Sequence, residues 1–234
     1  MAIEILACDT PELQSALFEF RYRIWAGELG AEVPEPAAAR MSDGTDQRAI
    51  NYAALDKGQI VGSLRVTDLR LLADASAMVS QYHLQDLVDA VGTGAMSHVG
   101  RLAVDRGNRG GACLLRLMEH ALVESVKRDI RAFFFDCSPY LLRMYETLGA
   151  VRTGAAFNDA MLGFKLPMAM VTRDIAYLEE IGSPFLRMLK DLPPDPVGPT
   201  WRQGRGVSGP TRSLAEPETL LANFEQRLDR KSVV

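Results

Sequence analysis

The spacing of apolar residues along the chain alternates between the period of a helix and the period of a strand. Helical spacing predicts helices at residues 10–24, 84–90, 112–128 and 139–148. Short apolar segments predict strands at residues 3–7, 51–55, 59–68, 97–104 and 130–136, with weaker strands from 151 to about 170. Because strands and helices follow one another along the chain, we expect an α/β (α+β) fold in which helices flank a central sheet.

Turn signals fix the order of several of these elements. Thr10-Pro11-Glu12 predicts a helix start, with an N-cap hydroxyl, proline at the first helical position and an acid in the first turn. Asp56-Lys57-Gly58 predicts a hairpin turn between two strands. Residues 97–136 show the order strand, Gly/Arg-rich turn, helix, strand. This βαβ order predicts that part of the sheet is parallel.

The end of the chain differs in character from the rest. Residues 174–190 predict a helix, residues 192–217 are rich in proline and glycine and predict a linker or loop, and residues 218–230 predict a last, mostly polar helix. We therefore expect one domain at residues 1–170 and a C-terminal helical and loop extension at residues 171–234.

Composition and charge narrow the function classes. The 234 residues are 47% hydrophobic, enough for one good core, and the net charge of −4 gives no sign of the basic face of a nucleic-acid-binding protein. No apolar run approaches the roughly 20 residues of a membrane span, and the first residues lack a signal-peptide pattern. The cysteines (Cys8, Cys113 and Cys137) and the three histidines are scattered. We expect a cytoplasmic protein without a metal site or a disulfide framework.

The turn at residues 105–111 has the chemistry of an anion site. Its small residues let backbone N–H groups face outward, and the N-terminus of the following helix adds partial positive charge. Arg106 and Arg109 can add charge-assisted hydrogen bonds to a phosphate. Pantetheine carriers bring phosphates, in coenzyme A or in the phosphopantetheine of a carrier protein. An ordinary tight turn with solvated arginines accounts for the same residues equally well.

This turn also resembles the acyl-carrier motif of the GNAT acyltransferases, Arg/Gln-x-x-Gly-x-Gly/Ala followed by a Leu-Leu pair. Read from Arg106, the chain keeps the second small residue as Gly111 but has Arg109 in place of the first glycine. Residues 21–25 (RYRIW) and 28–30 (ELG) resemble the N-terminal motif of acyl-homoserine-lactone autoinducer synthases and N-acyl amino acid synthases.

Further matches to these two synthase families follow in order, over roughly residues 15–170. Asp43 and Asp46, with Tyr52 six residues on, resemble their D-x-x-D-x5-Tyr stretch. Residues 58–65 (GQIVGSLR) resemble their hairpin, and residues 145–149 (YETLG) resemble the general GNAT element that begins with tyrosine.

Two departures separate the chain from the autoinducer synthases. Ala31 stands where their tryptophan follows the L-G pair, and His98 stands where their catalytic strand has glutamate. Both count against S-adenosylmethionine as the acceptor. The N-acyl amino acid synthases, or a related group, are therefore the nearer resemblance.

The resemblance implies a GNAT fold with a mixed central sheet and a role for each matching residue. The implied acyl-carrier-binding residues are Leu102, Ala103, Val104, Arg106, Arg109, Gly110, Gly111 and Ala112. The implied acceptor-binding residues are Arg21, Trp25, Asp43, Asp46, Arg65 and Arg101. Structural ion pairs and turn capping by the two aspartates are the alternative for that set.

Two residues are candidates for catalysis. We predict His98 as the general base because the unperturbed pKa of histidine lies near neutrality. Tyr145 matches the GNAT tyrosine that protonates the leaving thiolate. The alternatives are a packed or surface histidine and a tyrosine that only packs in the core. Cys137 as a thiol nucleophile is less favoured, because no motif places a histidine and an acid beside it.

The resemblance implies an N-acyltransferase that moves an acyl group from acyl carrier protein or acyl-CoA to the amine of an amino acid or similar small molecule. No permanently bound cofactor is expected, and the thioester is a co-substrate. The implied partners are then a small amine acceptor and, where it is the donor, an acyl carrier protein. Acetyl-CoA-dependent N-acetylation and a GNAT-like binding module without turnover are the alternatives.

Overall fold

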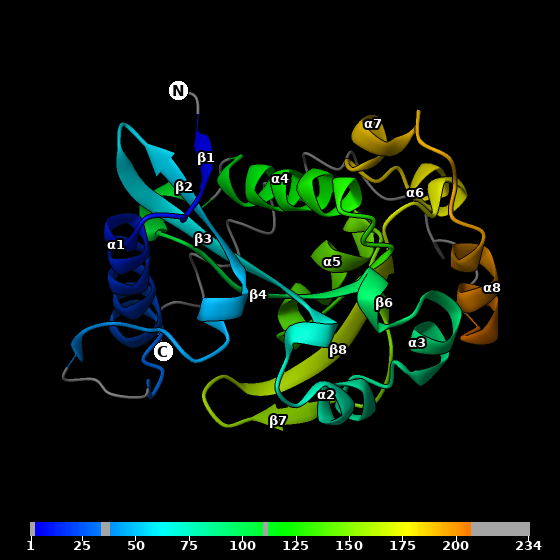
Figure 1. Ribbon diagram of the computed structural model, residues 1–234, viewed down its shortest axis with the longest axis horizontal. Helices are drawn as coiled ribbons and strands as arrows, with labels where there is room; N and C mark the ends of the chain where they lie inside the picture. The colour runs from blue at the N-terminus through cyan, green and yellow to red at the C-terminus, as the bar shows by residue number, and fades with distance from the viewer. Residues whose placement is uncertain (1–2, 34–37, 110–111, 207–234) are drawn as a thin grey trace.

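The computed structural model describes residues 3–33, 38–109 and 112–206, in which one mixed sheet carries helices on both faces (Figure 1). The strands are β1 (Glu4–Ala7), β2 (Ile50–Asp56), β3 (Gln59–Asp68), β4 (Met96–Val104), β5 (Ala132–Cys137), β6 (Val151–Arg152), β7 (Phe157–Asp159) and β8 (Gly163–Val171). The helices are α1 (Pro11–Tyr22), α2 (Ala75–Gln81), α3 (Gln85–Val91), α4 (Cys113–Lys127), α5 (Leu142–Leu148), α6 (Ile175–Glu180), α7 (Leu186–Leu189) and α8 (Val197–Gly204). A π-helical turn, η1 (Arg23–Glu28), continues α1, and short 3-10 turns are η3 (Asp46–Arg48), η4 (Leu69–Leu71), η5 (Thr93–Ala95), η6 (Arg106–Asn108) and η7 (Pro139–Leu141).

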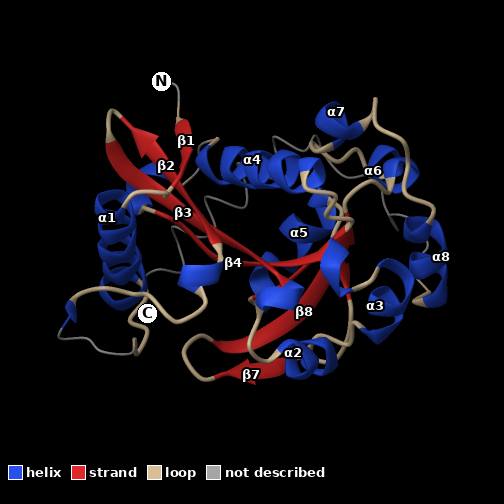
Figure 2. Cartoon of the chain, in the orientation of Figure 1, coloured by secondary structure: helices blue, strands red, loops and turns tan. Residues whose placement is uncertain are grey.

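The strands lie in the order β1-β2-β3-β4-β5-β8-β6, and β7 pairs with β8 (Figure 2). Strands β4 and β5 run parallel, and the other pairs among the described residues are antiparallel. The parallel pair is joined through α4, which confirms the βαβ unit predicted from the sequence.

Alternate residues of the strands face the two helical layers. On β2, Ala53 packs with Leu17 of α1, whereas its neighbour Ala54 packs in the cluster that includes Leu117 of α4. On β5, Phe134 packs in the cluster formed with α2 and α3, whereas Phe133 lies in the cluster formed with α4 and α5. Since side chains of a strand alternate between faces, α4 and α5 cover one face and α1, α2 and α3 the other.

The predicted turns are present where the sequence places them. Lys57 and Gly58 both have positive φ, of 51° and 78°, between the paired residues Asp56 and Gln59. This is the backbone twist that a tight hairpin requires. The hydroxyl of Thr10 accepts a hydrogen bond from the backbone N–H of Leu13 and caps α1.

Strands β4 and β5 separate after three paired residues. Their pairing runs from Met96 with Ala132 to His98 with Phe134, although both strands continue beyond it. Just past this point the register of β3 against β4 shifts, and Arg101 has a positive φ of 52°. A bulge of this kind bends a strand and changes the direction of its side chains. The result is a gap in the middle of the sheet.

The C-terminal segment differs from the prediction in two places. The helix predicted at residues 174–190 is two short helices, α6 and α7, because Gly182 takes a positive φ of 64° and Pro184 cannot continue a helix. The region predicted as loop contains α8. Its Trp201 is buried in the core cluster that contains Phe134.

One ion pair holds this segment together, and another fastens it to the residue before β5. Arg202 of α8 donates to Asp174 at 2.6 Å, and Arg131 before β5 donates to Asp195 at 2.7 Å.

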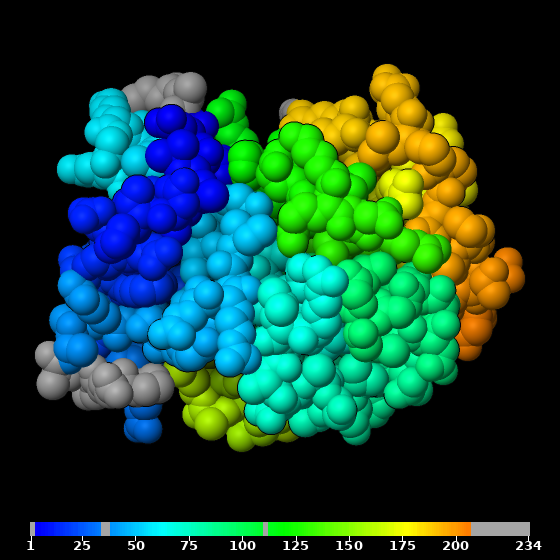
Figure 3. All heavy atoms as spheres, in the orientation of Figure 1, coloured from blue at the N-terminus to red at the C-terminus, as the bar shows by residue number. Residues whose placement is uncertain are grey.

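The N-terminal elements and the C-terminal helices lie at opposite ends of the face seen in Figure 3. The helix predicted at residues 218–230 lies outside the described residues, and the division at residue 170 stays a prediction. None of the described helices is long and apolar enough to cross a membrane.

Candidate functional site

A cavity of about 340 Å³ opens where β4 and β5 separate. Polar side chains line it on the face that carries Phe134, and apolar side chains line it on the α4 and α5 face. The polar lining includes Trp25, Arg65, Tyr82, His98, Arg101, Asp136 and Lys165. The apolar lining includes Met118, Phe133, Phe135, Tyr145, Leu148, Met170 and Phe185. The gap between the strands therefore joins two chemically different halves of one cavity.

Arg21 lies behind the polar half and has no exposed surface. Its guanidinium donates to Ser63 at 2.8 Å, to Asp46 at 2.7 Å and to Asn51 at 2.7 Å. Burial lowers its pKa to about 10 against the opposing effect of Asp46, so Arg21 stays charged at neutral pH. The Ser63 hydroxyl donates to the carbonyl oxygen of Arg101 at 3.0 Å, which ties Arg21 to the bulge of β4.

Arg65 and Arg101 share one carboxylate at the edge of the cavity. Asp43 accepts a hydrogen bond from Arg65 at 2.8 Å and from Arg101 at 2.6 Å. Burial alone raises the pKa of Asp43, but the two arginines outweigh burial and hold the pKa well below its usual range. Asp46 binds the backbone N–H of Asp43 at 2.9 Å and so connects this pair to Arg21. The structure thus brings Arg21, Asp43, Asp46, Arg65 and Arg101 into one network.

Several buried nitrogens of the cavity lining lack a hydrogen-bond partner among the described residues. They are Nε1 of Trp25, Nε of Arg65, Nε of Arg101 and Nε2 of His98. A buried polar group without a partner is unfavourable, and natural proteins keep few of them. The indole and guanidinium nitrogens are N–H donors, so this half of the cavity offers hydrogen bonds to an acceptor atom of a ligand.

His98 is surrounded by rings and by positive charge. Its imidazole lies 5.1 Å from the ring of Phe134 and 6.0 Å from that of Tyr82, and it fills the space beside the Cα atom of Gly100. Burial, followed by the charges of Arg65 and Arg101, lowers the pKa of His98 to about 3. The sequence predicted a histidine that titrates near neutrality. The surroundings instead favour a neutral imidazole.

Tyr145 lies in the apolar half, and its ring packs 4.8 Å from that of Phe135. Burial raises the pKa of its hydroxyl above the usual value, so Tyr145 is a proton donor at neutral pH. Cys137 also lines the cavity, and burial raises the pKa of its thiol to about 12. Because a protonated thiol is a poor nucleophile, this pKa also disfavours Cys137 as the catalytic nucleophile.

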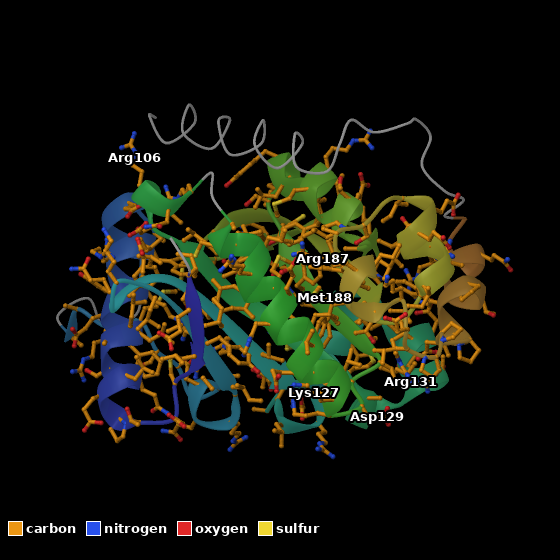
Figure 4. All side chains as sticks on the ribbon, turned by 90° about the horizontal axis from the view of Figure 1, so that it is seen from above. Arg106, Lys127, Asp129, Arg131, Arg187 and Met188 are labelled. Carbon is orange, nitrogen blue, oxygen red and sulfur yellow. The ribbon has the colours of Figure 1, made fainter. Side chains whose placement is uncertain are left out.

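The residues predicted to bind the acyl carrier occupy the end of β4 and the turn before α4. Leu102 lines the cavity, and Ala103 and Val104 are buried. Arg106 is exposed and points away from the body of the protein (Figure 4). Gly110 and Gly111 lie outside the described residues.

Arg109 is engaged by the protein itself. It donates to Glu28 at 2.5 Å and to the carbonyl oxygen of Val104 at 2.9 Å. Its side chain thus connects the turn to η1, whereas Ala112, at the start of α4, is exposed. Phosphate binding by Arg106, Arg109 and Ala112 stays a prediction.

Sequence reasoning missed part of the cavity. Asp136 on β5, Lys165 on β8 and Tyr82 after α2 line its polar half, and Phe185 of the C-terminal segment lines its apolar half. Asp136 carried a signal, because it is the one charged residue in an otherwise apolar strand. Lys165 and Phe185 carried none, since only the folded chain brings them to β5.

Arg21→Ala tests whether the buried network supports the fold. The change leaves Oδ1 of Asn51 buried without its donor and takes from Asp46 the nearer of its two arginines, and we expect it to lower the free energy of unfolding by about 3–5 kcal/mol. Urea denaturation measures this loss. Arg40→Ala is the control, because its ion pair with Glu19 is about half exposed and contributes about 0–1 kcal/mol. Equal losses for the two variants would contradict the account.

The protonation of His98 can be measured directly. Between pH 3 and 6.5 the unfolded chain binds a proton at His98 that the native state does not, so this group makes stability rise with pH in that window. We expect its NMR signal, assigned with His98→Gln, to show no titration between about pH 5 and 8. A titration midpoint near 6.5 would show that the imidazole is not desolvated.

Comparisons with known proteins identify the fold. No protein-family model matches the sequence, and no curated protein matches it. Among solved structures, the CoA-dependent acyl-homoserine lactone synthase BjaI, with SAM and isopentyl-CoA, is 18% identical over 95% of this chain and 98% of its own, with a TM-score of 0.58. FeeM, an N-acyl amino acid synthase from uncultured soil microbes, is 16% identical over 73% of this chain and 90% of its own, with a TM-score of 0.58.

An acyl-CoA N-acyltransferase from Pseudomonas aeruginosa is 15% identical over 73% of this chain and 100% of its own, with a TM-score of 0.53. The structures that this chain resembles are therefore those of synthases and transferases that handle acyl groups, as the sequence motifs predicted. These likenesses confirm the predicted architecture, and the chain has the fold of the GNAT acyltransferases.

Proposed function

We propose that the protein is an N-acyltransferase that moves an acyl group from a thioester to the amine of an amino acid or a similar small carboxylate. The observation that carries this proposal is the cavity at the gap between β4 and β5. Its arginine-lined half suits a charged acceptor, its apolar half suits an acyl chain, and the two meet between the strands. The fold shared with acyltransferases supports the same reaction class.

Charge favours a carboxylate on the acceptor. The network contains Arg21, Arg65 and Arg101 against Asp43 and Asp46, which leaves one positive charge in excess. Together with the unpartnered N–H groups of Trp25, Arg65 and Arg101, this charge matches an anionic group with several acceptor lone pairs. A simple amine without an acid group would leave these donors unsatisfied.

Acyl transfer at this site follows from the positions of the remaining groups. Beyond His98, β4 has no partner on the β5 side within the described residues, so its backbone N–H groups near Leu102 can orient the thioester carbonyl and its oxyanion. Neutral His98 supplies a ring nitrogen that can accept a hydrogen bond from the acceptor amine. Tyr145 supplies the proton for the leaving thiolate.

The apolar lining, which includes Leu148, Met170 and Phe185, favours a medium or long acyl chain over acetyl. The donor is acyl-CoA or acyl carrier protein, used as a co-substrate by a cytoplasmic enzyme. A second candidate is a GNAT-like binding module without turnover. Arg109 favours it, because this residue replaces a glycine of the carrier motif and its side chain is paired with Glu28.

Product analysis tests the proposal. The chain is expressed in a bacterial host, and bound and secreted lipids are read by mass spectrometry. We expect N-acyl amino acids that disappear in a His98→Ala, Tyr145→Phe double variant of equal expression. Acetylated amines alone would identify a short-chain N-acetyltransferase. If neither product forms, and acyl-CoA or acyl carrier protein still raises the melting temperature, the binding module is the better account.

Phe185 tests the position of the acyl chain. It is 2% exposed and closes the apolar half from the C-terminal segment. We expect Phe185→Ala to shift the preferred donor toward longer chains, because the lost ring enlarges the apolar half of the cavity.

The control is Leu189→Ala, which removes a residue that is 1% exposed and does not line the cavity. Both variants should lose stability, but only Phe185→Ala should change the order of rates across a series of acyl-CoA lengths. If both variants keep the wild-type order of rates across the acyl-CoA series, the acyl chain does not bind beside Phe185.

A further inference from the structure

Asp136, Lys165 and Tyr82 form a polar group that the predicted roles do not include. Asp136 is the last residue but one of β5, Lys165 lies on β8, and both line the cavity with Tyr82. Nζ of Lys165 lies 3.7 Å from Oδ1 of Asp136 and donates to the hydroxyl of Ser138 at 3.3 Å. The Lys165 side chain is only 9% exposed, whereas that of Asp136 is 26% exposed. The carboxylate is thus the more accessible member of a largely buried ion pair.

Strand geometry places Asp136 on the acceptor side of the cavity. The last paired residues of β4 and β5 are His98 and Phe134, and Asp136 follows two positions later on the same face. Tyr82 joins these residues, because its ring contacts both His98 and Phe134 and its hydroxyl donates to Asp136 at 2.7 Å. Asp136 therefore stands across the gap from the strand that carries His98.

Asp136 has an oxygen available for a ligand. Tyr82 binds Oδ2, and no hydrogen bond reaches Oδ1 from the part of the chain that the structure describes. Both oxygens of Asp43 are held, by Arg65 and by Arg101. Asp159 lies on β7 and accepts from two backbone N–H groups of its own turn at Oδ1. Because Asp136 stands across the gap from the strand that carries His98, it is the carboxylate better placed to meet a cation there.

We infer that the Asp136 carboxylate binds the ammonium group of the acceptor and receives the proton that this group gives up, with Tyr82 and Lys165 as positioning residues. The inference rests on the proposed function and adds the second half of acceptor recognition. The carboxylate of the acceptor lies at Arg65 and Arg101, and its nitrogen lies at Asp136. Neutral His98 is a weak base in this environment, which leaves the anionic oxygen as the stronger partner for an ammonium ion.

The proton and electron pairs balance in this scheme. One ammonium proton passes to Oδ1 of Asp136, and the freed lone pair forms the C–N bond to the thioester carbonyl carbon. The C–S bond then breaks as the tetrahedral adduct collapses, and its electron pair leaves on sulfur. A second nitrogen proton reaches the thiolate, directly or by way of the Tyr145 hydroxyl, and Asp136 releases its proton to water. The products are an amide, a free thiol and one proton.

Several titratable groups line the same cavity as Asp136. They are Tyr82, His98 on β4, Tyr145 on α5, Asp159 on β7 and Lys165 on β8. Burial and then Asp136 itself raise the pKa of Tyr82, so its hydroxyl stays a donor across the working range. Lys165 is the one cation of this group, and its Nζ lies 3.7 Å from Oδ1 of Asp136.

The test measures thiol release from decanoyl-CoA and decanoyl acyl carrier protein with each of the common L-amino acids, from about pH 5 to 10. For every amino acid that wild type uses, we expect Asp136→Asn to lower kcat/KM at pH 7 by about 10- to 100-fold, the effect of losing one charge-assisted hydrogen bond. The loss should shrink as pH approaches the range in which the free amine exists. The KM of the acyl donor should stay unchanged.

Two further variants separate this role from a structural one. Lys165→Met keeps the carboxylate, so it should lower kcat/KM less than Asp136→Asn and should keep the pH dependence of wild type. Tyr82→Phe should cause a smaller loss than Asp136→Asn, without the recovery at high pH. These variants also decide the matter if Asp136→Asn does not fold.

A loss in Lys165→Met as large as that in Asp136→Asn, or an Asp136→Asn profile parallel to that of wild type, would overturn the inference while leaving the proposed function intact. No thiol release by wild type with any amino acid, with carboxylate-free amines accepted instead, would overturn both.

Discussion

Arg21 brings a full positive charge to a place without exposed surface, and the acceptor half of the cavity is arranged around it. Its nitrogens hold Ser63 on β3, Asp46 before β2 and Asn51 on β2. A buried charge needs hydrogen-bond partners, because burying an unpaired charge costs far more free energy than burying an ion pair. Through Ser63 this requirement fixes the carbonyl of Arg101 at the bulge of β4, and through Asp46 it fixes the loop that carries Asp43. The two arginines that face the cavity are therefore placed by a third that does not line it.

The bulge has a second consequence, which is the separation of β4 from β5. A sheet interior normally pairs all of its backbone groups, whereas here two neighbouring strands lose their pairing in the middle of the fold. The gap joins the face that carries charged side chains to the face that packs against α4 and α5. An amine held on the charged side can then reach a carbonyl carbon whose chain lies on the apolar side. In this account one sheet binds the charged acceptor on one face and the acyl chain on the other, and the two substrates meet at the gap between β4 and β5.

The sequence allowed much of this to be predicted. Turn chemistry predicts the hairpin at Lys57 and Gly58, and helical periodicity predicts α4. The ordered motif matches alone assign Arg21, Asp43, Asp46, Arg65 and Arg101 to one predicted site. Local patterns could not show what distant segments do to a residue. The pKa of His98 depends on Arg65, Arg101 and the rings around it, and Arg109 is engaged by Glu28 from a segment about 80 residues earlier. Asp136, Lys165 and Phe185 belong to the cavity only because β5, β8 and the C-terminal segment meet there.

The proposed function requires one cavity to hold a carboxylate at the arginines and an acyl chain in the apolar half. Isothermal titration of the purified protein with N-decanoylglycine and with its methyl ester tests this most directly, since the two ligands share the chain and differ in the charge. The account predicts that the acid binds about tenfold or more tightly than the ester, and that Arg101→Met removes most of this difference. Equal affinity of acid and ester in the wild-type protein would contradict it.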